Sequence, residues 1–98
     1  MVITILEAQV SPEKTQALEH AFKQAIHELD RGIVETFLLH SSKDEVLWQI
    51  VTVWESREAL DAMRRSGNTP RGVLMFRAAD AEPVLSVFDV MAHGMASA

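Results

Sequence analysis

The strongest pattern in the sequence lies in residues 45–56, EVLWQIVTVWES, where apolar side chains occupy both alternating sets of positions. Residues two apart along a β-strand point to the same face of a sheet. One face of this segment then carries Val46, Trp48, Ile50, Thr52 and Trp54, and the other carries Leu47, Gln49, Val51 and Val53. A strand with one face in water alternates apolar with polar residues. The segment therefore predicts a strand that is covered on both faces.

A strand and an amphipathic helix are predicted before this segment. Residues 2–10 are rich in β-branched side chains, which favour a strand. Ser11 can cap a helix, Pro12 suits its first turn, and Glu13 favours the positive end of its dipole. Apolar residues then recur at helical spacing until residues 30–32 end the helix: Leu18, Phe22, Ala25, Ile26 and Leu29. With one apolar stripe, this helix covers one surface only.

Residues 33–41 and 46–54 predict the two strands of a hairpin, because the polar SSKDE between them suits a turn. If residues 40 and 46 face each other, the face with Trp48 also carries Val34, Thr36, Leu38 and His40. The opposite face then carries Ile33, Glu35, Phe37 and Leu39. The sequence does not show which of these faces meets the helices.

Two further helical segments and a last strand follow the hairpin. Ser56 is placed to cap a helix that stops near Gly67. Residues 71–79 predict a short helical piece, and Pro83 precedes a strand over residues 84–91. The order β-α-β-β-α-β, with one extra short helix, is typical of the split βαβ, ferredoxin-like fold of the α+β class. In this fold a four-stranded antiparallel sheet carries its helices on one face.

Helices on one face leave the second apolar face of the hairpin without cover from its own chain. Exposing such a face to water is costly. A second copy of the same sheet is the simplest cover. The pattern therefore predicts a homodimer with a two-fold, isologous interface.

Length and composition narrow the class of protein. The 98 residues suffice for one domain, expected over residues 1–92 and followed by a mobile tail at 93–98. A formal charge of −5 disfavours nucleic acid and anionic membranes as partners, and no apolar run is long enough to span a membrane. Without cysteine the chain has no disulfide or thiolate. The first residues lack a secretory signal pattern, so we expect a cytoplasmic protein.

Two motifs connect this order of elements to a known family. Residues 10–13 read VSPE at the end of the first strand, and residues 52–60 read TVWESREAL, of which WESREAL is the most specific part. Over residues 1–91 the chain resembles the antibiotic biosynthesis monooxygenase domain of the dimeric α+β barrel superfamily. The resemblance implies a homodimer. Members include cofactor-free enzymes that oxidise polyketide phenols or hydroquinones with dioxygen, haem-degrading oxygenases, and proteins without an assigned role.

The haem-degrading members share an Asn on the first strand, a Trp in the second helix and a His in the next helical segment. The corresponding positions here are approximately Leu6, Met63 and Val73. The resemblance therefore does not extend to haem degradation, and it implies no cofactor. Many other members carry a histidine in or just after the second helix, whereas residues 61–79 contain none. That departure favours a non-catalytic role.

A cofactor-free oxygenase must deprotonate a phenol or enol in a dry pocket and stabilise the resulting anion. His40 is the candidate catalytic base, because a histidine side chain titrates near neutral pH. Its place at the end of a strand equally suits a partly exposed structural histidine. The candidate substrate-binding residues on the same face are Thr36, Trp48, Thr52 and Trp54. The two tryptophans can stack on a planar ligand or simply form core.

Other polar residues leave alternatives open. His20 and His27 lack a third ligand nearby, so no metal site is predicted. Glu35 and Gln49 need polar partners if their face is buried, or contact a substrate if it lines a cavity. Arginines around the second helix can draw in an anionic substrate or form surface salt bridges: Arg64, Arg65, Arg71 and Arg77.

Two functions remain, and a purely structural dimer is a third possibility. The first is cofactor-independent monooxygenation of a small phenolic, quinol or polyketide-like compound. The second is a non-catalytic dimer of the same fold that binds a small hydrophobic or aromatic molecule or has a regulatory role. Oxygen uptake that depends on a quinol and falls when His40 is replaced separates the first from the second.

Overall fold

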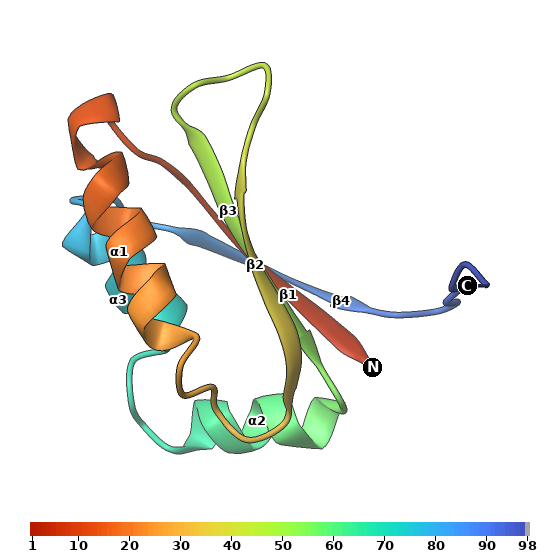
Figure 1. Cartoon of the computed structure of the whole chain (residues 1–98). Helices are drawn as coiled ribbons and strands as arrows, with labels where there is room; N and C mark the ends of the chain where they lie inside the picture. The colour runs from red at the N-terminus through yellow and green to blue at the C-terminus, as the bar shows by residue number, and fades with distance from the viewer. Residues whose placement is uncertain (98) are drawn as a thin grey trace.

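A computed structural model describes residues 1–97 of the protein and contains one four-stranded sheet and three α-helices (Figure 1). The elements, in chain order, are β1 (Val2–Gln9), the 3-10 turn η1 (Pro12–Lys14), α1 (Thr15–Ala25), β2 (Ile33–His40), β3 (Leu47–Trp54), α2 (Arg57–Arg65), α3 (Arg71–Ala78) and β4 (Val84–Asp89). The strands lie in the order β2-β3-β1-β4, and every neighbouring pair is antiparallel. The predicted α+β, ferredoxin-like fold is confirmed.

The helices decide which face of the sheet is buried. α1 and α3 pack side by side against the sheet, and α2 lies across one end of it (Figure 1). The side chains buried beneath them alternate along the two central strands: Val2, Leu6 and Ala8 of β1, and Trp48, Ile50 and Trp54 of β3. We refer to this side, which includes the Trp48 side of the hairpin, as the covered face. The opposite side is the bare face.

The pairing of β2 with β3 corrects the expected register. His40 pairs with Trp48, two residues beyond the assumed partner. A shift of two residues keeps each side chain on its predicted face, because side chains alternate along a strand. The start of β2 is the exception, since an irregularity between Ile33 and Glu35 pairs Ile33 with Trp54. Strict alternation put Ile33 on the wrong face, because it takes no account of such a bulge.

Of the two helix caps predicted from the sequence, one forms and the other does not. Ser56 caps α2 as expected, since its hydroxyl oxygen accepts a 3.1 Å hydrogen bond from the Ala59 amide. The expected cap at Ser11 is wrong, because its side chain makes no such bond and the chain forms η1 before α1 begins. α1 ends at Ala25, earlier than predicted. Residues 26–32 therefore form a connection, the α1–β2 loop, which reaches toward α3.

The core consists of two buried clusters on the covered face. The larger cluster lies under α1 and α3 and includes Leu18, Phe22, Trp48, Ile50 and Phe76. The smaller cluster lies under α2 and consists of Val2, Trp54 and Leu60. Thr4 of β1 pairs with Thr52 of β3 between the two clusters. Two small polar residues thus replace large apolar ones in the middle of the covered face.

The bare face stays exposed in the single chain. Its apolar side chains Phe37, Leu39 and Phe88 are 44%, 45% and 53% exposed. Gln49, whose surroundings the sequence left open, lies on this face and donates a 2.7 Å hydrogen bond to the Glu7 carboxylate. A contiguous apolar surface of this kind is typical of an interaction site.

Residues 90–97 form no helix or strand and run away from the sheet after β4 (Figure 1). The mobility expected for residues 93–98 stays a prediction, and residue 98 lies outside the described residues. Within residues 1–97, every helix is too short or too polar to cross a bilayer.

Candidate functional site

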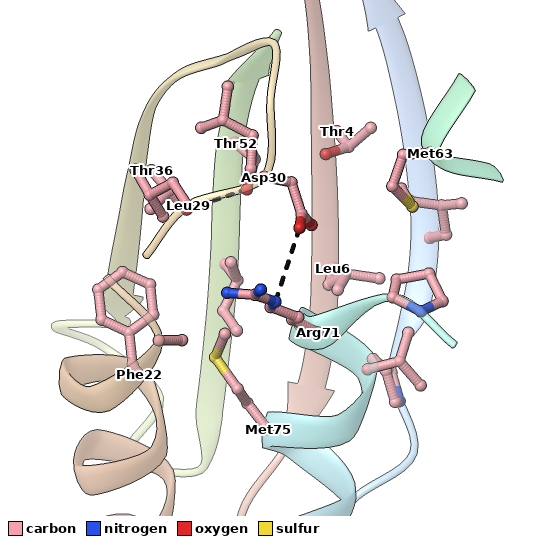
Figure 2. Close-up of a pocket in the computed structure, with 18 of the residues that line it drawn as sticks. Thr4, Leu6, Phe22, Leu29, Asp30, Thr36, Thr52, Met63, Arg71 and Met75 are labelled. Carbon is pink, nitrogen blue, oxygen red and sulfur yellow. Dashed lines mark hydrogen bonds and ion pairs between the residues drawn. The ribbon is translucent and has the colours of Figure 1, made fainter. Parts of the chain in front are cut away.

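A cavity of about 240 Å³ lies between the covered face of the sheet and the three helices (Figure 2). Its floor comes from β1, β2 and β3, and its walls come from α1, α2, α3 and the α1–β2 loop. Most of the lining is apolar, with Leu6 and Ile50 on the floor and Phe22, Met63 and Met75 on the walls. Ligand sites commonly combine an apolar lining with a few placed polar groups. The volume lies below the roughly 300–1,000 Å³ typical of drug-sized ligands, so it suits a small molecule.

Three threonines form a polar row across this apolar floor. Thr52 of β3 pairs with Thr4 of β1 on one side and with Thr36 of β2 on the other. All three line the cavity, where they lie on neighbouring strands (Figure 2). Directly opposed side chains of an antiparallel pair have Cβ atoms about 4.5–5.5 Å apart. One ligand atom can therefore contact two of these hydroxyls at once.

The hydrogen bonds of the row leave one donor and one acceptor unused. The indole N–H of Trp54 donates to the Thr4 hydroxyl oxygen at 3.1 Å, and within residues 1–97 the Thr4 proton has no acceptor. The Thr36 hydroxyl donates to the Val51 carbonyl at 3.2 Å. In the 2.9 Å contact between Thr36 and Thr52 either hydroxyl can donate, and in both arrangements Thr52 keeps an unused lone pair, because a hydroxyl oxygen has two. Thr4 thus offers a proton and Thr52 offers a lone pair, side by side.

Charged residues from the helices and loops also line the cavity. Arg77 binds the Glu82 carboxylate through two nitrogens, at 3.1 and 2.8 Å, and this hydrogen bonding lowers the pKa of Glu82 from its ordinary value. Arg71 is held more loosely, with its Nε atom 3.6 Å from the Asp30 carboxylate and a further hydrogen bond to the Glu28 carbonyl. Figure 2 shows the Arg71 guanidinium reaching from α3 over the cavity toward Asp30.

Of the substrate-binding residues predicted from the sequence, some line the cavity and one does not. Thr36, Thr52 and Trp54 line the cavity, and their role in substrate binding stays a prediction. Trp48 does not line it, because it lies further along β3 in the larger core cluster and is 5% exposed. Its indole N–H is buried and has no partner within residues 1–97.

His40 also lies outside the cavity lining. It is exposed at the hairpin end of β2, stacked on Trp48 with ring centroids 4.1 Å apart and planes within 7°. Its Nε2 atom lies 2.8 Å from the Glu45 carbonyl oxygen. These contacts fit the structural alternative, and a catalytic role for His40 stays a prediction.

Sequence reasoning missed Thr4 and did not place the arginines. Thr4 is separated from Thr52 by almost half the chain, and only the pairing of β1 with β3 brings them together. The signal was a polar residue on the otherwise apolar covered face of β1. Of the four arginines near the second helix, Arg64, Arg71 and Arg77 line the cavity, whereas Arg65 does not.

The lining residues do not fit haem bound through histidine. The three positions aligned with the haem-degrading pattern, Leu6, Met63 and Val73, all line the cavity and are all apolar. No histidine is among the described lining residues. Residues 1–97 also contain no group of three histidine or acidic side chains that could hold a metal ion.

Comparison with known proteins gives a family and several related folds. A family model described as antibiotic biosynthesis monooxygenase matches residues 1–72. MhuD, a haem degrader from Mycobacterium tuberculosis solved with two haems in its active site, is 26% identical, with a TM-score of 0.68 over 97% of this chain and 100% of its own. SnoaB, a cofactor-independent oxygenase from Streptomyces nogalater, is 17% identical, with a TM-score of 0.69 over 94% of each chain.

A third structure, a candidate antibiotic biosynthesis monooxygenase from Nitrosomonas europaea, is 20% identical, with a TM-score of 0.67 over 94% of this chain and 100% of its own. Among curated proteins, no sequence gives a significant match. Family and fold together support a general role of monooxygenase type or in small-molecule binding.

Proposed function

Because the chain belongs to the antibiotic biosynthesis monooxygenase family, we propose that it binds a small planar phenol or quinol in the cavity and oxidises it with dioxygen without a cofactor. The observation that carries this proposal is the unused donor of Thr4 beside the unused acceptor of Thr52. A phenolic oxygen can accept a hydrogen bond from Thr4 and donate its own proton to Thr52. The ring then lies over the apolar floor beside Trp54.

Oxidation needs a substrate that supplies its own electrons. In the proposed reaction a phenol loses the hydrogen of its hydroxyl and one hydrogen of a ring carbon, that carbon gains one oxygen atom as a carbonyl, and the second atom of dioxygen leaves as water. The phenol first loses its proton to solvent. Thr4 then stabilises the resulting anion, because a hydrogen-bond donor in an apolar cavity favours negative charge at that point.

A non-catalytic binding module is the second candidate, and one observation favours it. The carboxylates that line the cavity, Asp30 and Glu82, are both paired with arginines. Among the described lining residues there is no imidazole to take a proton. A cavity without a free base suits binding at least as well as proton abstraction.

We also propose that two copies pair through their bare faces. The two-fold packing of identical sheets would bury Phe37, Leu39 and Phe88, which water otherwise contacts. The proposed domain comprises residues 1–92 of each copy. The lack of cysteine agrees with a proposed cytoplasmic location.

Oxygen consumption with anthrone, the keto tautomer of a tricyclic phenol, tests the reaction directly. We expect uptake above the uncatalysed rate, with quinone as product and kcat/KM lowered about tenfold in Thr4→Val and in Thr52→Val, the effect of one lost hydrogen bond to a charged group. Thr15→Val, at a half-buried position of α1 outside the cavity lining, is the matched control. Binding without uptake would favour the non-catalytic module, and a loss in His40→Asn alone would restore His40 as the base.

A further inference from the structure

We propose that the mouth of the cavity is an anion-binding subsite formed by Arg64 and Arg71, and that the ligand carries a carboxylate in addition to its phenolic ring. This inference rests on the proposed function, since it uses the same cavity. The ligand would lie with its hydroxyl on the threonine row and its carboxylate at the arginines. The two ends of one molecule would then be recognised by different chemistry.

The first argument is the local reversal of charge. The whole chain has a formal charge of −5. The cavity lining nevertheless carries three arginines against the two acids Asp30 and Glu82, an excess of one positive charge. In an acidic protein, a positive group beside an apolar cavity attracts anionic ligands to that place rather than to the surface in general.

The second argument is that the arginines are engaged to different degrees. Glu82 binds Arg77 through both carboxylate oxygens, so Arg77 has its ion-pair partner. The Asp30 carboxylate is 3.6 Å from Arg71, longer than a charge-assisted hydrogen bond of about 2.7–2.9 Å. Within residues 1–97, Arg64 has no ion-pair partner. Arg71 also donates one hydrogen bond to the Glu28 carbonyl, and its other N–H groups, together with those of Arg64, remain for a ligand.

The loose pair suggests how the subsite accepts its ligand. Asp30 comes from the α1–β2 loop and Arg71 from the first residue of α3, and their side chains are 34% and 45% exposed. A partly exposed pair in contact with water is weak, so a carboxylate with better geometry can replace it. Asp30 thus occupies, in the free protein, the position that the ligand carboxylate takes on binding.

A pair of ligands that differ by one group tests this proposal. 2-Naphthol has the phenolic ring alone, and 6-hydroxy-2-naphthoate adds a carboxylate at the far end. Binding is followed by quenching of Trp54 in a Trp48→Phe background, where Trp54 is the one tryptophan and lines the cavity. We expect the naphthoate to bind about tenfold more tightly, as an added charge-assisted hydrogen bond provides. This preference should weaken at high salt.

Substitutions then locate the subsite. Arg64→Gln and Arg71→Gln should each reduce the preference to about twofold or less without changing 2-naphthol affinity. Arg65→Gln, next to Arg64 but outside the cavity lining, should leave the preference intact. Asp30→Asn removes the competing carboxylate and should increase the preference for 6-hydroxy-2-naphthoate over 2-naphthol.

The outcomes separate the two proposals. Equal affinity for both ligands, or an equal effect of Arg65→Gln, overturns the anion subsite and leaves the proposed function standing. Failure of both ligands to quench Trp54 overturns the phenol site and, with it, this inference. A preference that survives both Arg64→Gln and Arg71→Gln places the anion elsewhere and contradicts the assignment.

Discussion

The two faces of the sheet are both apolar in sequence, but the folded chain treats them differently. On the covered face, large side chains fill both ends and threonines occupy the middle, where a cavity remains. On the bare face, Phe37, Leu39 and Phe88 stay exposed. The comparison shows that hydrophobicity alone does not distinguish a face that encloses a cavity from a face that is left exposed. The covering helices and the small residues beneath them make that distinction.

Truncating the packed part of the covered face should have the largest effect. Phe76 of α3 is 0% exposed in the larger core cluster. Phe76→Ala should lower the free energy of unfolding by about 3–5 kcal/mol, because it leaves a void among close-packed side chains. Urea unfolding measures this loss. Leu74→Ala, at an exposed position of the same helix, should cost far less, and similar losses would show that α3 does not cover a core.

Charging the bare face should break association without breaking the fold. Phe37→Asp puts a carboxylate in the proposed interface and should weaken dimerisation by about 2 kcal/mol or more, as at the centre of an interface. Native mass spectrometry over a concentration series gives the stoichiometry. Leu74→Asp, equally exposed on the helical side, is the control and should remain dimeric. An unchanged dimer in Phe37→Asp rules out the bare face as the interface.

The threonine row predicts a smaller, ligand-specific effect. Thr52→Val removes the free acceptor and should weaken 2-naphthol binding by about 1–1.5 kcal/mol, the net value of a hydrogen bond. Calorimetric titration measures the affinity. Naphthalene, which lacks the hydroxyl, should bind both proteins equally. A matching loss for naphthalene means that the substitution changed the cavity and not a hydrogen bond.

The two tryptophans of the covered face should differ on substitution. Trp54→Phe leaves the Thr4 hydroxyl without its buried donor, whereas Trp48→Phe removes an N–H that has no partner within residues 1–97. Both lose packing volume, so Trp48→Phe should cost about 1 kcal/mol less in unfolding free energy than Trp54→Phe. Equal costs would show that the Trp48 N–H has a partner, such as a bound water.

The smallest effect concerns pH. Arg77 lowers the pKa of Glu82, so the pair stabilises the fold above the ordinary carboxyl pKa, and this contribution is lost as pH falls through the lowered value. Glu82→Gln should therefore flatten the acid side of the stability profile slightly. Urea unfolding between pH 3 and pH 7, measured beside Glu19→Gln as a control, detects it. If the pH profile of Glu82→Gln is unchanged, the exposed pair makes no measurable contribution to the free energy of unfolding.

Periodicity and turn residues predicted the fold because they act locally. The strand in residues 45–56 and the Ser56 cap are both read from neighbouring residues, and both are confirmed, whereas cover of the second face of that strand stays a prediction. The bulge at Ile33 and the early end of α1 were not predicted, since packing against α2 and α3 decides them. The same division holds for the site. Alternation placed Thr36 and Thr52 on the same face, but the observed pairing of β2 with β3 made them neighbours, and the pairing of β1 with β3 added Thr4.

The sequence did not indicate where each residue of the covered face lies along the length of the sheet relative to the helices. Trp48 and Trp54 occupy equivalent alternating positions on one strand. α1 and α3 cover Trp48, however, whereas Trp54 borders the cavity. His40 pairs with Trp48 at the hairpin end of the sheet, four residues along the strands from the Thr36–Thr52 pair. Residue type and periodicity select a face, and only the placement of the helices selects a position along it.

The tight contact at Gly32 bears on the rates at which a ligand enters and leaves the cavity. The backbone of this glycine has a φ of +92°, and a Cβ there would lie 2.5 Å from the Ala59 Cβ, so the α1–β2 loop touches α2 with no space between them. The loop meets α3, in contrast, through the polar contacts of Arg71. The cavity should therefore open between the α1–β2 loop and α3, where the contacts are polar. Ligand exchange would then be limited by breaking an ion pair and a hydrogen bond, and its rate should rise with ionic strength while the fold stays intact.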